Sequence, residues 1–225
     1  MRRYALLIDF GGTLDADGEP WVERFYRLYR SAGGAGDRAR FRTAFARSDD
    51  QLARLPGIAA LGYAATVAAQ ASLLAELLAD GACLAGPDLP DLFVEDAVGV
   101  ARRNREVLLE LSETHQLAVI SNYQGNLQPC LDELELGDLF DVVSDSEVIG
   151  ARKPDRRIFD ATLAALDCDA ERCWMIGDSP PNDIAAAASL GMATCWLADD
   201  ARPAIGIAPD VRVARFDQVP RALAA

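Results

Sequence analysis

Several side chains on which enzymes often depend are almost missing from this sequence. His115 is the only histidine among the 225 residues, which argues against a Ser–His triad and against a histidine-rich metal site. Lys153 is the only lysine, whereas the other 21 basic residues are arginines. Because an ammonium group and a guanidinium group bind their partners differently, we interpret position 153 as one that requires an ammonium.

Positive charge and paired cysteines are also scarce. The sequence has 22 Lys and Arg against 35 Asp and Glu, so its formal net charge is −13, and we expect no general binding to nucleic acid or to an anionic membrane. An anionic ligand would need a local cation or backbone N–H groups aimed at it. The five cysteines form no CxxC motif and are predicted to be small apolar residues in a reducing cytosol. They are Cys83, Cys130, Cys168, Cys173 and Cys195.

Long apolar runs are absent as well. No run approaches the roughly 18 apolar residues of a membrane-spanning helix, and we expect no membrane partner. The apolar run before Asp9 is too short for a signal peptide, so we predict a cytoplasmic protein, either a monomer or a homodimer. With 51% hydrophobic residues, the chain is nevertheless apolar enough to bury a large core.

The most informative stretch that is present lies at residues 5–14. The four apolar residues 5–8 are typical of a strand that is buried on both faces. Asp9 ends this run, and Gly11 and Gly12 allow the backbone to turn tightly and to approach a ligand closely. In an open parallel sheet, ligands bind beyond the carboxyl ends of the strands, so Asp9 is predicted to lie at a functional edge.

Strand patterns return in the second half of the chain. They occur at 117–120, 140–143, 173–176, 193–197 and 211–213. Helical patterns separate them, which predicts right-handed crossovers and a Rossmann-like parallel sheet in a three-layer α/β/α class. Residues 15–101 show only helical patterns, so we predict an inserted helical domain there. The predicted α/β core is therefore discontinuous and consists of residues 1–14 and 102–225.

Two further acidic residues, Asp178 and Asp183, follow the strand predicted at 173–176, and we expect them to meet Asp9 at one sheet edge. Two like charges about 4 Å apart repel by about 4 kcal/mol at an effective dielectric constant near 20. Three such carboxylates require a cation or raised pKa values. Carboxylate and carbonyl oxygens without a nearby His or Cys favour Mg²⁺.

Four short motifs follow the predicted strands in order. They are DFGGTL at 9–14, SN at 121–122, RKPD at 152–155 and GDSPPND at 177–183. Together they resemble the haloacid dehalogenase-like hydrolase superfamily, and the insertion at 15–101 resembles its helical cap of the first type. The resemblance implies a Mg²⁺-dependent phosphatase that acts on a small phosphorylated substrate through an aspartyl-phosphate.

The resemblance also implies a role for each matching residue. Asp9 would be the nucleophile that takes the phosphoryl group. The catalytic residues would be Asp9, Ser121 and Lys153. The residues that bind the phosphoryl group would be Gly12, Ser121, Asn122 and Lys153. The metal ligands would be Asp9, the backbone carbonyl of Gly11, Asp178 and Asp183.

The sequence departs from the family pattern at Gly11. In phosphatases of this superfamily the residue two positions after the nucleophile is usually a second Asp, which protonates the leaving group and later activates water. Gly11 keeps the backbone carbonyl but supplies no side-chain acid. Because general acid–base catalysis contributes about 10²–10⁴ in rate, we expect either substrates with good leaving groups or another acid. Asp15 and Asp17 are the candidates for that acid.

Two other functions stay open. The dehalogenase branch of the superfamily also lacks the second Asp, although it does not need the acidic motif at 177–183. A branch that cleaves phosphonates uses a lysine of the cap, and residues 15–101 contain none. The chain is alternatively a weakly active or inactive member that binds a phosphorylated ligand or a partner protein. Phosphate release with Mg²⁺, or halide release without it, would separate these functions.

Overall fold

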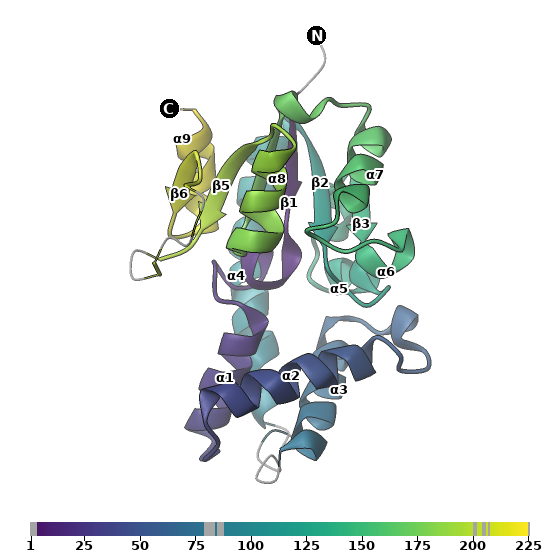
Figure 1. The fold of residues 1–225 in the computed structure, drawn as a ribbon, viewed down its shortest axis with the longest axis vertical. Helices are drawn as coiled ribbons and strands as arrows, with labels where there is room; N and C mark the ends of the chain where they lie inside the picture. Colours follow the sequence, from purple (N-terminus) through teal and green to yellow (C-terminus); the bar gives the residue numbers. More distant parts are fainter. Residues whose placement is uncertain are drawn as a thin grey trace.

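The computed structural model describes residues 4–78, 84, 88–199, 202–203, 206 and 208–224. Six parallel strands form one sheet in the order β3-β2-β1-β4-β5-β6. The strands are β1 (Tyr4–Ile8), β2 (His115–Ser121), β3 (Val142–Asp145), β4 (Cys173–Gly177), β5 (Ala193–Leu197) and β6 (Val211–Val213). The predicted α/β class is confirmed, and β1 lies between β2 and β4 near the middle of the sheet (Figure 1).

The central strand is buried on both faces, as its apolar sequence predicts. Leu6 and Ile8 pack into one hydrophobic cluster, whereas Ala5 and Leu7 pack into a second cluster on the opposite face. Helices α7 (Arg156–Leu166) and α8 (Ala185–Ser189) cover the second face. The first face is covered by α9 (Val219–Leu223) and the C-terminal half of α4 (Asp88–Ser112), so the core has three layers (Figure 1).

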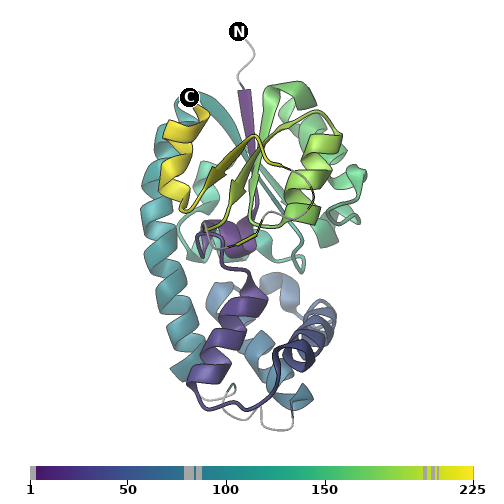
Figure 2. The same cartoon turned by 60° about the vertical axis from the view of Figure 1, so that its left-hand side comes forward.

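The described part of the inserted region contains helices joined by loops, and no strand. It contains α1 (Trp21–Ser31), α2 (Arg38–Leu52), α3 (Tyr63–Leu77) and the first half of α4. These helices lie beyond the carboxyl ends of the strands, and α4 runs from them along the side of the sheet (Figure 2). The boundary that the sequence predicts at 101/102 falls inside α4, so the division into a core and a cap stays a prediction.

One strand is displaced from its predicted position. The prediction was 140–143, whereas β3 is Val142–Asp145. Asp141 lies before the strand, where its carboxylate accepts a hydrogen bond from the Leu117 N–H at 2.9 Å. Asp145 ends the strand and accepts from the N–H groups of Gly125 and Leu127 in the turn that leads into α5 (Leu127–Glu133) and from that of Glu147 in α6 (Ser146–Ile149). A buried acid thus occupies a position that the apolar pattern did not predict.

Two composition-based expectations concern cysteines and membranes. The four cysteines in the described part of the chain carry free thiols, and Cys83 lies outside the described residues. None of the described helices combines the length and the apolar character that crossing a bilayer requires.

Candidate active site

Asp9 lies directly after β1, where the chain turns sharply at Phe10–Leu14. Its backbone N–H donates to the carbonyl of Ile176 in β4 at 2.9 Å, which fixes the turn to the neighbouring strand. Gly12 has a φ of 92°, a conformation that favours glycine. A Cβ atom at Gly12 would also lie 3.1 Å from the carboxyl atoms of Asp178, so a side chain there would press on the site.

The three predicted metal ligands with carboxylates meet at this edge. Asp9, Asp178 and Asp183 are buried, and one carboxylate oxygen from each lies within 4.8 Å of the others. Asp178 follows β4, and Asp183 lies in the turn that leads into α8. A Cβ atom at Gly177 would lie 2.3 Å from Asp183 Oδ2, so this close approach depends on the glycine that precedes Asp178.

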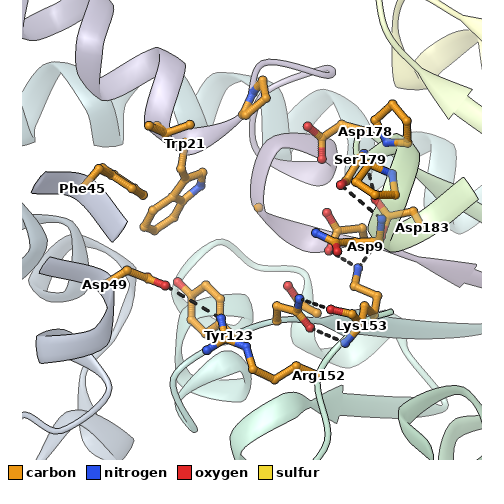
Figure 3. A pocket seen from close by; sticks show the side chains of 18 of the residues that line it. Asp9, Trp21, Phe45, Asp49, Tyr123, Arg152, Lys153, Asp178, Ser179 and Asp183 are labelled. Atoms are coloured by element: carbon orange, nitrogen blue, oxygen red, sulfur yellow. Dashed lines mark hydrogen bonds and ion pairs between the residues drawn. The ribbon is translucent and has the colours of Figure 1, made fainter. Parts of the chain in front are cut away.

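The single lysine of the chain reaches into the same cluster. Lys153 Nζ donates to Asp183 Oδ1 at 2.6 Å and to Asp9 Oδ1 at 2.8 Å (Figure 3). Its loop is held by Asn122, whose side chain donates to the Lys153 carbonyl at 2.9 Å and accepts from the Lys153 N–H at 2.7 Å. The amide of Asn122 is therefore occupied in positioning the lysine.

Burial and mutual repulsion govern the charges of the cluster. Burial raises the pKa of Asp178 well above its ordinary value, and the charges of Asp9 and Asp183 raise it further. Burial also raises the pKa of Asp183 to about 6, although Lys153 lowers it. Burial alone would lower the pKa of Lys153, but the charges of Asp183 and Asp9 outweigh that effect and raise it. The site holds more negative charge than its ammonium balances, and its donors are all oxygen atoms, so Mg²⁺ fits it.

Comparisons with known proteins agree with this geometry. The family model described as haloacid dehalogenase-like hydrolase matches residues 5–191. The chain belongs to the haloacid dehalogenase-like hydrolases. The match covers the turn at Asp9, the loop at Lys153 and the acidic motif after β4.

Several curated relatives of this hydrolase are phosphatases. The pyrimidine 5'-nucleotidase YjjG of Escherichia coli (strain K12) is 35% identical over 111 residues, which cover 48% of this chain and 49% of that protein. The phosphoserine phosphatase of Thermus thermophilus is 28% identical over 95% of this chain and 96% of that protein. The chain spans about half the length, or less, of the first curated relatives that it matches.

Solved structures of other haloacid dehalogenase-like hydrolases share the fold. The HAD-hydrolase YfnB from Bacillus subtilis, bound to magnesium, matches with a TM-score of 0.61 and 22% identity over 98% of each chain. The L-2-haloacid dehalogenase RSc1362 matches with a TM-score of 0.66 and 17% identity over 100% of each chain. At these identities the likeness establishes the fold alone.

The remaining predicted site residues have different surroundings in this hydrolase. Ser121 ends β2 and lines the pocket, and its side chain makes no hydrogen bond to another described residue. Gly12 does not line the pocket, and its N–H donates to Asp15 Oδ1 at 2.7 Å. The Gly12 N–H is thus engaged within the turn, and its assignment to the phosphoryl group stays a prediction.

The two candidates for a replacement acid also point elsewhere. Asp15 is buried and accepts from Trp21 Nε1 and the Tyr63 hydroxyl, both at 2.6 Å, in addition to Gly12. Asp17 pairs with Arg103 and accepts from the Phe216 N–H at 3.1 Å. Neither residue lines the pocket. Burial raises the pKa of Asp15, but its carboxyl group faces the interior, so we do not retain either as the acid.

The pocket continues away from the nucleophile as a cavity of about 490 Å³ between the sheet edge and the helices. Trp21 and Phe45 line one side, and Asp49 of α2 lies across the cavity from Asp9 (Figure 3). Asp49 Oδ1 accepts from Gln124 Nε2 at 2.5 Å, and its other oxygen lies 3.8 Å from Arg152. Sequence reasoning did not find Asp49, Gln124 or Arg152 as pocket residues, because only the packing of α2 against the core brings them together.

Proposed function

We propose that this hydrolase is a Mg²⁺-dependent phosphatase that acts on a small phosphorylated metabolite. The observation that carries the proposal is the buried cluster of Asp9, Asp178 and Asp183 beside Lys153. An ordinary turn would not bury three carboxylates around one ammonium, because their mutual repulsion costs several kcal/mol without a cation. The names of several curated relatives, including the phosphoserine phosphatase, support the same reaction class.

Asp9, Asp178, Asp183 and the backbone carbonyl of Gly11 would hold the metal ion. When bound, Mg²⁺ supplies positive charge that neutralises the phosphoryl oxygens. Lys153 holds the same anion from the other side and lowers the repulsion between Asp9 and the incoming phosphate. Ser121 lines the pocket, and its hydroxyl would donate to a further phosphoryl oxygen. Asn122 acts indirectly, because its side chain holds the backbone of Lys153.

The reaction would proceed in two displacements at phosphorus. The Asp9 carboxylate attacks the phosphorus atom, a new Asp–O–P bond forms, and the bond from phosphorus to the leaving oxygen breaks. The leaving group departs with the electron pair of that bond. Water then hydrolyses the aspartyl-phosphate, which releases inorganic phosphate and regenerates the carboxylate of Asp9.

A second candidate function is removal of halide from a 2-haloacid. Gly11 favours it, because the dehalogenases of this superfamily also lack the second Asp, and dehalogenases occur among the structural neighbours. The acidic cluster favours the phosphatase, because attack on carbon needs no metal ion. The third possibility is a weakly active or inactive protein that binds a phosphorylated ligand or a partner protein. Turnover of a phosphate ester would exclude it.

The experiment is a panel of phosphate monoesters assayed for phosphate release with and without Mg²⁺. We expect release that depends on Mg²⁺ and falls by at least 10³-fold in Asp9→Asn, because that change removes the nucleophile. Asp160→Asn is the matched control, since Asp160 is an exposed carboxylate that pairs with Arg156 on α7. Halide release without added metal, or binding without turnover, would overturn the phosphatase.

We further propose that residues 15–101 act as a cap that closes over the pocket and excludes water. The cap would supply Trp21, Phe45 and Asp49 to the wall that faces the leaving group. A cytoplasmic location and a monomeric or homodimeric state complete the proposal.

A further inference from the structure

An indole ring borders the space of the missing acid. Gly11 has φ −72° and ψ 116°, values that any L-residue adopts, so its backbone does not demand glycine. A Cβ atom built there would lie 3.3 Å from Trp21 Nε1 and 3.5 Å from Trp21 Cδ1. Trp21, and not the backbone, is therefore what crowds a side chain at position 11, and the indole would have to move by a few tenths of an ångström to admit one.

The ring of Trp21 is held firmly in that place. Its Nε1 donates to Asp15 Oδ2, which also accepts from the Tyr63 hydroxyl. Phe93 and Tyr123 pack against it at centroid distances of 5.3 and 6.1 Å with steep interplanar angles. Buried Asp15 thus serves to orient the indole, and the part of the ring that remains accessible lines the cavity beside Phe45 (Figure 3).

Among the described residues, the cavity offers no acid beside the nucleophile that is free of the metal cluster. Of the carboxylates that line it, Asp9, Asp178 and Asp183 form the cluster, and Asp49 lies on the far side. Asp49 is also engaged with Gln124 and Arg152. The described part of the pocket therefore presents a flat apolar wall where a proton donor would be needed.

We infer that the substrate is an aryl phosphate, that is, a phosphate ester of an acidic ring hydroxyl whose ring lies against Trp21. This inference rests on the proposed phosphatase function and names its substrate class. A phenol-type oxygen leaves as a stable anion, so it needs no protonation by residue 11. The aromatic ring gains contact with Trp21 and Phe45, and polar groups on its far edge reach Asp49, Gln124 or Arg152.

Four compounds separate the two parts of this inference. Phenyl phosphate has a ring and a good leaving group, benzyl phosphate has a ring and a poor one, acetyl phosphate has only the good leaving group, and propyl phosphate has neither. We expect the rate at which the aspartyl-phosphate forms, measured in a single turnover, to follow the leaving group, with phenyl phosphate at least 10²-fold above benzyl and propyl phosphate. We expect KM to follow the ring, with phenyl and benzyl phosphate about three- to tenfold below their partners.

Variants of two residues test the assignment to Trp21 and Gly11. Trp21→Leu should raise KM for the two ring compounds by a larger factor than KM for propyl phosphate. Gly11→Asp combined with Trp21→Phe makes room for an acid, and it should raise kcat for propyl phosphate at least tenfold. The matched control is Gly11→Asn with Trp21→Phe, which has the same size and no acid and should give no such gain.

The outcomes distinguish this inference from the function on which it rests. If the wild-type enzyme forms the aspartyl-phosphate from propyl phosphate at a rate within tenfold of that for phenyl phosphate, the inference is wrong while the phosphatase stands. A selective loss of alkyl phosphate turnover in Asp49→Asn would also overturn it, because Asp49 would then be the acid. If none of the four compounds releases phosphate with Mg²⁺, the proposed function fails and the inference fails with it.

Discussion

Replacing Asp178 by Asn should make the metal-free protein more stable while it removes the response to Mg²⁺. Asp178 carries the least compensated charge of the cluster, because Lys153 contacts Asp9 and Asp183 and the nearest cation to Asp178 is Arg202, at 3.6 Å. Asn keeps the shape of the side chain and removes its charge. The variant therefore measures how much the repulsion between the carboxylates lowers the unfolding free energy of the metal-free protein.

The spacing of the carboxylates sets the magnitude. Two unit charges no more than 4.8 Å apart repel by about 3.5 kcal/mol or more at an effective dielectric constant near 20, and Lys153 and Arg202 offset part of this. We expect a net gain of about 2 kcal/mol in the metal-free protein, or about 4–8 °C in Tm for a chain of this length. In the wild type, Mg²⁺ at about ten times its Kd should add about 1.4 kcal/mol.

Thermal unfolding with EDTA or with Mg²⁺ measures both effects. Metal-free Asp178→Asn should melt above the metal-free wild type, and only the wild type should gain stability when Mg²⁺ is added. The exposed control Asp160→Asn should change the unfolding free energy by less than about 0.5 kcal/mol and keep the response to Mg²⁺. A metal-free Asp178→Asn protein that melts below the wild type, or that Mg²⁺ stabilises equally, would refute the reasoning.

Three further predictions concern single side chains. Lys153→Met should lower the unfolding free energy of the metal-free protein by about 3–5 kcal/mol, because Asp9 and Asp183 lose their buried partner. Urea titrations measure this loss, and a value below about 1 kcal/mol would contradict the prediction. Asp145→Ala should cost about 2–3 kcal/mol by the same measurement, because three backbone N–H groups lose their acceptor, and an unchanged midpoint would count against it. Burial raises the pKa of Asp49 above its ordinary value of 3.8. The folded protein therefore binds the proton of Asp49 more tightly than the unfolded chain does. The resulting stabilisation is complete below pH 3.8 and is lost as the pH rises through the raised pKa. Asp49→Asn should therefore lose less Tm than the wild type as the pH rises above about 4, and parallel pH profiles would argue against a raised pKa.

The strands and the hydrolase family were predictable because short-range patterns determine them. The apolar run 5–8 indicates a strand that is buried on both faces and therefore lies in the middle of the sheet. The carboxylate that follows it then lies at the edge where the strands end. Lys153 was predictable from its singularity, and the structure places its ammonium between two carboxylates. The error at β3 has a local cause, since Asp145 ends the strand as an acceptor for nearby N–H groups and breaks the apolar pattern.

The wall of the pocket was not predictable, because it depends on how the helices pack against the core. Trp21 has the helical spacing of a core residue, and nothing in that spacing indicates that its ring lies against Gly11. Asp15 follows the nucleophile closely in sequence, which made it a candidate acid, yet its carboxylate faces Trp21 and Tyr63. Asp49 is 75 residues from Gln124, so their contact has no signature in the sequence.

The most direct measurement is to trap the covalent intermediate at Asp9. The enzyme is mixed with phenyl phosphate and Mg²⁺, quenched with acid within milliseconds, digested and analysed by mass spectrometry. The account predicts one phosphoryl group on the peptide that contains Asp9, and none when EDTA replaces Mg²⁺ or when Asp9→Asn is used. Steady release of phosphate from the Asp9→Asn variant, or a phosphoryl group on another residue, would contradict it.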